Sequence, residues 1–207
     1  MIDERNKPRS VWVTHFDTYS VQEFYDSFVD LENNPMVNVI PVFINSYGGE
    51  VFSYIAKRDL LQTSDRPVST ICMGKAMSCG AYLLAAGTKG LRFATPDSRI
   101  LIHQVSGGVR GKTSDITFDA KDIQSLNDTV FENLSKDTGI SVAKFKQEMK
   151  NRDNTDWTLT AEEALKWGII DKIGVPRHIY PQGSTALAVN IKKEDLLQKK
   201  STKKRGR

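Results

Sequence analysis

The sequence has little of what a membrane span, a secreted fold or a metal site would need. Its 207 residues include two cysteines and three histidines, and no apolar run is long enough to span a bilayer. Cys72 and Cys79 share one apolar stretch, and their spacing fits neither a disulfide framework nor a metal-ligand pattern. The N-terminus is polar and lacks an apolar signal segment. We therefore expect a protein of the reducing cytoplasm, without a membrane span, metal or cofactor.

The positive net charge is confined to the C-terminus. Residues 191–207 contain eight Lys or Arg and two acidic residues, a net charge of +6. The whole chain carries +4, so the rest of it is slightly acidic, at −2. No aromatic residue lies among the basic ones, whereas tails that bind single-stranded nucleic acid commonly add aromatic stacking. We expect a solvated, disordered tail rather than a nucleic-acid-binding one.

Strand-like runs alternate with segments of helical periodicity, which predicts an α/β fold with parallel strand pairing. Ser20 and Glu23 form a capping box that predicts a helix start at Ser20. Pro41 predicts that the regular part of the second strand begins after it, and Gly74 predicts a sharp turn after the third. Strands are expected at 10–14, 37–45, 68–73, 100–103 and 169–173, and helices from 20, at 50–62, 78–86, 114–137 and from 160 to 168.

Three strand ends carry residues suited to acyl transfer. Gly48 and Gly49 follow an apolar strand, where free backbone N–H groups can hold an oxyanion, although most Gly-Gly pairs are only turns. Ser78 stands at a helix start among small residues, a place for a nucleophile but more commonly for an N-cap. His103 ends another apolar strand and could be the base that a serine needs, although a lone histidine is more often structural.

Four segments, in the same order and at compatible spacing, resemble the caseinolytic protease (ClpP) family of serine peptidases. They are INSYGG at 44–49, CMGKAMSCGAYLLAAG at 72–87, RILIHQVSGG at 99–108 and TLTAEEALKWGIIDKI at 158–173. The resemblance covers roughly residues 10–175 and implies a ClpP/crotonase-like α/β fold with repeated β-β-α turns. It also implies that the helix at 114–137 is a protruding handle that joins two rings. We expect a peptidase domain at 1–175 and a C-terminal extension at 176–207.

The resemblance implies a role for each matching residue. The implied catalytic residues are Ser78 as nucleophile, His103 as base and Asp156 as the acid that orients the histidine. The implied oxyanion hole is formed by the N–H groups of Gly49 and Cys79. The implied substrate-binding positions are Gly48, Gly107 and Gly108. The segment that precedes the acid is a few residues longer than we expect for the family. Asp153 therefore remains an alternative acid.

The implied activity is that of a serine endopeptidase acting on peptides or unfolded proteins through an acyl-enzyme, in heptameric rings that can stack in pairs. Tyr47 replaces the family's proline, which predicts a narrower or more aromatic cleft entrance. Few residues precede the first strand, which leaves little room for the axial loop that engages AAA+ unfoldases. Action without an ATPase, or in a dedicated system such as that of a phage, is therefore an alternative to unfoldase-assisted proteolysis.

Three other interpretations compete with an active peptidase. The first is a catalytically inactive ring subunit or scaffold, which a complete set of catalytic residues disfavours. The second is an α/β-hydrolase esterase, a class whose chain order is serine, acid, histidine. Here the histidine comes before the acid. The third is a crotonase acting on acyl-CoA, which would have no use for this set of residues.

Overall fold

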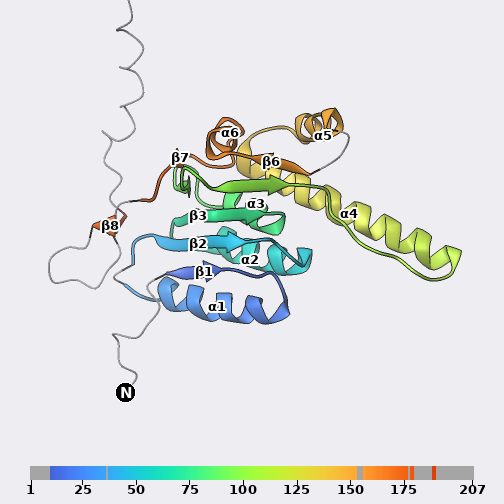
Figure 1. Ribbon diagram of the computed structural model, residues 1–207. Coiled ribbons are helices and arrows are strands. Elements are labelled where there is room, and N and C mark those ends of the chain that lie inside the picture. The colour runs from blue at the N-terminus through green and yellow to red at the C-terminus, as the bar shows by residue number, and fades with distance from the viewer. Residues whose placement is uncertain (1–9, 36, 153–155, 177, 180–187, 190–207) are drawn as a thin grey trace, which may run out of the picture.

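A mainly parallel sheet organises the chain, with helices packed along it (Figure 1). The computed structural model describes residues 10–35, 37–152, 156–176, 178–179 and 188–189. The strands are β1 (Val11–Val13), β2 (Ile40–Ser46), β3 (Val68–Met77), β4 (Arg92–Ala94), β5 (Arg99–Ile102), β6 (Trp157–Leu159) and β7 (Lys172–Ile173). The helices are α1 (Thr18–Glu32), α2 (Val51–Thr63), α3 (Cys79–Ala85), α4 (Thr113–Thr138), α5 (Val142–Asn151) and α6 (Ala161–Lys166). Two short strands, β8 (His178–Ile179) and β9 (Ala188–Val189), pair with each other in an antiparallel sheet of their own.

The sheet order follows from parallel crossovers. Strands β1, β2, β3, β4 and β7 lie side by side in that order, and each pair is parallel. The helices α1, α2 and α3 connect the first four of these strands and pack against one another in sequence. Residues Val68 to Cys72 of β3 are all buried, because this strand lies between neighbours and is covered on both faces. The α/β class with parallel pairing, predicted from the sequence, is confirmed.

A glycine in the middle of β3 lets that strand pair with two partners in turn. Residues 70–72 pair with β4 and residues 75–77 pair with β5, and Gly74 lies between the two stretches. Its φ of +88° is open to glycine but strained for other residues. The prediction that the strand ends at a sharp turn at Gly74 is therefore wrong. The strand bends there and continues to Met77, directly before Ser78.

Two other local predictions are corrected. Helix α1 begins at Thr18, and Asp17 is its N-cap; the capping box joins Asp17 to Ser20, not Ser20 to Glu23. Strand β2 begins at Ile40 and includes Pro41. The proline is tolerated because β1 reaches only to the residue opposite Val42, so its missing N–H interrupts no pairing with β1.

The C-terminal part of the body differs most from expectation. The strand predicted at 169–173 is reduced to β7, because the residues after α6 pack into the core instead. The helix predicted from 160 to 168 forms as α6, with Thr160 as its N-cap. Strands β4 and β6 and helix α5 were not predicted. The expected disordered tail at 191–207 lies outside the described residues, and the domain boundary at 175 stays a prediction.

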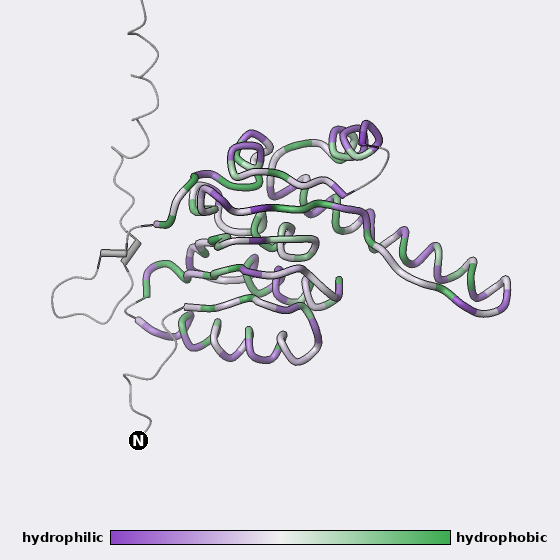
Figure 2. Tube along the Cα trace, viewed as in Figure 1, coloured by the Kyte–Doolittle hydropathy of each residue, from purple (hydrophilic) through white to green (hydrophobic). Residues whose placement is uncertain are grey.

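Helix α4 projects from the body (Figure 1), and its bounds match the prediction within one residue. Its buried residues all lie in the second half, at Asn127, Val130, Phe131, Leu134 and Thr138. The first half exposes Ile116 and Phe118, and Figure 2 shows apolar and polar residues alternating along this projecting part. Among the described residues, no helix combines the length and the apolar character that crossing a bilayer requires.

Candidate active site

Ser78 occupies the turn between β3 and α3 in a strained conformation. Its φ of 54° and ψ of −123° make it the one non-glycine residue with positive φ in the described part of the chain. Such strain is costly and is concentrated at functional sites, as in the strand-to-helix nucleophile turns of other hydrolases. Although Ser78 stands at the N-cap position of α3, its side chain makes no capping hydrogen bond. The interpretation of Ser78 as an ordinary helix cap is therefore wrong.

Hydrogen bonds fix both the backbone N–H and the backbone carbonyl of Ser78. Its N–H donates to the carbonyl of Leu101 at 2.8 Å, which holds the turn against β5. Its carbonyl accepts from Ala81 and from Tyr82, at 2.9 and 3.2 Å, and this closes the first turn of α3. The half-buried serine is thus held in place by backbone hydrogen bonds that do not involve its hydroxyl.

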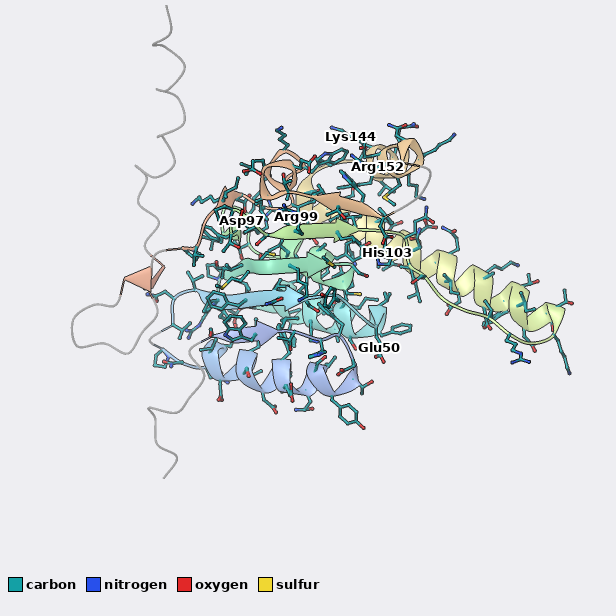
Figure 3. All side chains as sticks on the ribbon, viewed as in Figure 1. Glu50, Asp97, Arg99, His103, Lys144 and Arg152 are labelled. Carbon is teal, nitrogen blue, oxygen red and sulfur yellow. The ribbon has the colours of Figure 1, made fainter. Side chains whose placement is uncertain are left out.

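Strand register brings His103 and Asp156 to the same end of the sheet as Ser78. Strand β5 runs parallel to β3, with Leu101 opposite Met77, so both strands end on the same side. Strand β6 is antiparallel to β5, with Ile102 opposite Trp157. His103 directly follows β5 and Asp156 directly precedes β6, so these two residues come directly after the last pair of the register. Figure 3 shows His103 at the carboxyl end of β5, on the side from which α4 projects.

Tyr82 ties the histidine to helix α3. Its hydroxyl donates to the carbonyl of His103. The backbone nitrogen of His103 lies 3.4 Å from the Tyr82 hydroxyl oxygen. Burial raises the pKa of Tyr82, and the negative charge of Asp156 contributes to this rise. The phenol therefore stays protonated as a donor and holds His103 beside the helix that begins at the serine.

The three catalytic candidates lie at the same end of the sheet, but their side chains are not joined. In the part of the chain that the structure describes, no hydrogen bond links the side chains of Ser78, His103 and Asp156. Asp156 is exposed, directly before β6. The alternative acid, Asp153, lies outside the described residues.

Gly48 and Gly49 pass close to the nucleophile. A Cβ on Gly48 would lie 2.7 Å from the Ser78 Cβ and 3.2 Å from the Cys79 nitrogen. The two glycines have φ values of +97° and +150°. Within the described residues, no backbone carbonyl outside the regular elements accepts from the N–H of Gly49 or of Cys79. Both groups are available to stabilise a developing oxyanion beside Ser78.

The remaining predicted positions lie around this centre. Gly107 and Gly108 are in the segment between β5 and α4, which the structure assigns to no strand within this chain. Gly107 packs so close to α4 that a Cβ would lie 2.7 Å from the Ile123 Cδ1. At the other side of the serine, Tyr47 is 74% exposed, and the Lys75 ammonium lies 4.1 Å from the centre of its ring. This cation–π pair was not predicted.

Other candidate centres carry no comparable chemistry. In the described ranges, no group of three or more His, Cys, Asp or Glu is placed to hold a metal ion. A cavity of about 330 Å³ lies between β1, α1 and Lys57 and is lined by none of the predicted site residues. His15 lines that cavity, and its Nδ1 lies 2.9 Å from the Thr14 hydroxyl. The His178 side chain lies outside the described residues.

The family model described as Clp protease matches residues 7–177. A similar curated protein is the ATP-dependent Clp protease proteolytic subunit of Deinococcus radiodurans, which is 44% identical over 134 residues. The aligned region covers 65% of this chain, and the chain spans 64% of the length of that relative.

Proposed function

The chain belongs to the Clp protease family, and on that premise we propose that it is a serine endopeptidase acting on peptides or unfolded proteins. One observation supports the proposal: Ser78 has a strained backbone and makes no capping hydrogen bond, at the end of the sheet where His103 directly follows β5 and Asp156 directly precedes β6. The parallel α/β fold of the structure is consistent with that family. An esterase of the α/β-hydrolase class and an acyl-CoA crotonase lose their support, since the family match covers all four motifs.

The proposed mechanism assigns one step to each group. His103 takes the proton of Ser78 as the hydroxyl attacks the peptide carbonyl, and Asp156 fixes the histidine tautomer and stabilises the imidazolium. The N–H groups of Gly49 and Cys79 stabilise the tetrahedral oxyanion. His103 then protonates the leaving amine, and water attacks the acyl-enzyme with His103 again as base. The main chain at Gly48, Gly107 and Gly108 binds the extended substrate.

A catalytically inactive ring subunit or scaffold is the second candidate. The observation that favours it is the missing hydrogen bond between the three side chains in the described structure. Catalytic hydrogen bonds are often long in unliganded enzymes and tighten when substrate binds. The available Gly49 and Cys79 N–H groups favour the active enzyme, because a scaffold has no use for them.

A fluorophosphonate probe, which labels only an activated serine, separates these candidates. We expect wild type to be labelled and Ser78→Ala not to be labelled. Cleavage of a fluorogenic peptide is expected to fall at least about 10³-fold in the same variant. Absence of labelling of wild type in every oligomeric state would establish the inactive scaffold.

The identity of the acid needs its own comparison. We expect Asp156→Asn to slow both labelling and peptide cleavage, by up to about 10⁴-fold in the cleavage rate, because the histidine loses the partner that fixes its tautomer. Asp153→Asn is the matched control and is expected to keep wild-type rates. The reverse pattern would make Asp153 the acid.

We also propose that the chain assembles into heptameric rings that can stack in pairs through α4. The name of the Deinococcus relative includes ATP dependence, which supports assistance by an AAA+ unfoldase. The alternative, action without an ATPase, predicts degradation of unfolded casein by this chain alone. Light scattering of the purified protein tests the ring, and a monomeric mass would contradict it. A location in the cytoplasm stays a prediction.

A further inference from the structure

The side chain of Cys79 bonds to the glycine loop that faces the nucleophile. Its Sγ donates to the carbonyl of Gly49 at 3.2 Å, and the residue is only 1% exposed. Burial raises the pKa of the Cys79 thiol, so the group stays protonated and can act as the donor. The residue that follows Ser78 therefore contributes two donors to this region: its backbone N–H and its thiol.

The same glycine loop is held from a second side. The N–H of Glu50 donates to the carbonyl of Phe16 at 2.8 Å, so the Gly49–Glu50 peptide has a partner at both its oxygen and its nitrogen. Before it, the Gly48 N–H donates to the Ser46 hydroxyl at 3.1 Å. The N–H groups of Gly48 and Glu50 are thus bonded, whereas in the described part of the chain no backbone carbonyl outside the regular elements accepts from the Gly49 N–H, which is the proposed donor to the oxyanion.

The two glycines depend on such outside contacts. Gly48 and Gly49 have φ values of +97° and +150°, and glycine has no side chain to favour one backbone conformation over another. Bonds from the surrounding structure must therefore set the direction of the Gly49 N–H. The bond from Cys79 links this loop directly to α3, the element that carries the second proposed oxyanion donor.

We propose that the Cys79 side chain is a positioning residue, whose thiol holds the Gly48–Gly49 loop against the start of α3 and so aligns the two oxyanion donors. This inference rests on the proposed peptidase function. It assigns to the sulfur a task separate from that of the Cys79 backbone. A misplacement of about 1 Å can cost about 10²-fold in rate, and a thiol is a weak donor, so we expect an effect of about tenfold.

The kinetic test compares wild type with Cys79→Ala, Cys79→Ser and Cys72→Ala. We expect Cys79→Ala to lower the rate constant for fluorophosphonate labelling and the kcat for a peptide about tenfold, with KM within about twofold, because the oxyanion forms after substrate binding. Cys79→Ser keeps a donor and is expected to recover most of the rate. Cys72→Ala removes an equally buried sulfur from β3 and is expected to react like wild type.

Hydrogen exchange gives a readout that does not need activity. We expect the amides of the 46–52 segment, that of Glu50 above all, to exchange faster in Cys79→Ala than in wild type, Cys79→Ser or Cys72→Ala. If wild type is not labelled, the proposed function fails, and the exchange rates alone decide the positioning role. The inference is overturned if Cys79→Ala matches wild type in exchange. It is also overturned if Cys79→Ser is as impaired as Cys79→Ala, or if Cys72→Ala is impaired equally, because lost packing would then explain the effect.

Discussion

At the scale of single residues, Gly48 leaves no room for a side chain beside the nucleophile. A Cβ there would lie 2.7 Å from the Ser78 Cβ and 2.8 Å from the Met77 carbonyl oxygen. Both contacts are with parts of the β3–α3 turn that cannot swing away, unlike the end of a flexible side chain. A substitution must therefore move the loop, and with it the Gly49 N–H.

We accordingly expect Gly48→Ala to lower fluorophosphonate labelling of Ser78 by about 10²-fold or more, the cost of losing one oxyanion donor. Gly139→Ala is the control, because Gly139 has a similar φ of +77° but a Cβ there would meet nothing within 4 Å. Its cost is backbone strain alone, about 1–2 kcal/mol of unfolding free energy, with unchanged labelling. Equal labelling of the two variants would contradict the steric argument.

Lys57 is a buried amine whose charge the fold tolerates poorly. Its Nζ donates to the His15 carbonyl at 2.9 Å and to the Ser20 hydroxyl at 2.7 Å, and the residue is 1% exposed. Burial lowers the pKa of Lys57 from 10.5 to about 8, and the nearby charges of Asp17 and Glu23 only partly oppose this. At pH values between the folded pKa of about 8 and the unfolded pKa of 10.5, Lys57 is protonated more often in the unfolded chain than in the folded one. The contribution of Lys57 to the free energy of unfolding therefore rises with pH.

The Lys57→Met variant tests this rise of stability with pH. From pH 7 to pH 9.5, the unfolding free energy of wild type should rise relative to that of Lys57→Met by about 1–2 kcal/mol. Urea denaturation at both pH values measures it. Lys89→Met, at an exposed position, is the control and should show no such change. A difference that stays constant, or that falls with pH, would rule out a destabilising buried charge.

At the scale of elements, the first half of α4 contributes nothing to the core of its own chain. Its buried residues begin at Asn127, whereas Phe118 is 70% exposed. Exposed apolar side chains on a projecting helix are suited to contact with a partner, here proposed to be the facing ring.

We therefore expect Phe118→Glu to reduce the mass of the particle by about half, from paired rings to single ones, because a charge cannot be buried at that contact. The melting temperature of the chain should change little, since Phe118 packs against no core residue of its own. Tyr19→Glu, at an 85% exposed aromatic on α1, is the control and should keep the wild-type mass. An unchanged mass for Phe118→Glu would exclude α4 from the contact.

The elements show what the sequence could predict. The ends of α4 were predictable because its apolar stripe is formed by residues close together in the sequence, and because Gly139 caps the helix in the left-handed conformation. The three-residue strands β4 and β6 are too short for periodicity to reveal. The pairing of β5 with β6 joins residues more than fifty positions apart, so Asp156 could be assigned as the partner of His103 only through the family resemblance. The strain at Ser78 and the thiol bond of Cys79 are tertiary features without a local signal.

At the scale of the whole molecule, one buried arginine joins elements from distant parts of the chain. The Arg92 side chain, 2% exposed, makes two hydrogen bonds to the Asp171 carboxylate, at 2.7 and 2.8 Å. It also donates to the carbonyls of Ala85 and Asp137, at 3.1 and 2.9 Å. Strand β4, the ends of α3 and α4 and the turn before β7 are thereby fixed to one another, behind the helix that carries Ser78 at its start.

Removing the charge of Asp171 should therefore destabilise the domain in a pH-dependent way. Burial alone would raise the pKa of Asp171, but the hydrogen bonds and charge of Arg92 outweigh it and leave the pKa below its ordinary value of 3.8. The stabilisation is then complete above about pH 4 and is lost as the pH falls through the lowered pKa.

We expect Asp171→Asn to lose about 3 kcal/mol of unfolding free energy at pH 7, because Arg92 stays buried without its partner. The deficit relative to wild type should shrink by pH 3. Denaturation followed by tryptophan fluorescence at both pH values measures this. Asp128→Asn, which breaks the exposed pair with Lys146, should lose almost nothing at either pH. An equal deficit at pH 7 and pH 3 would mean that packing, and not the ion pair, accounts for the role of Asp171.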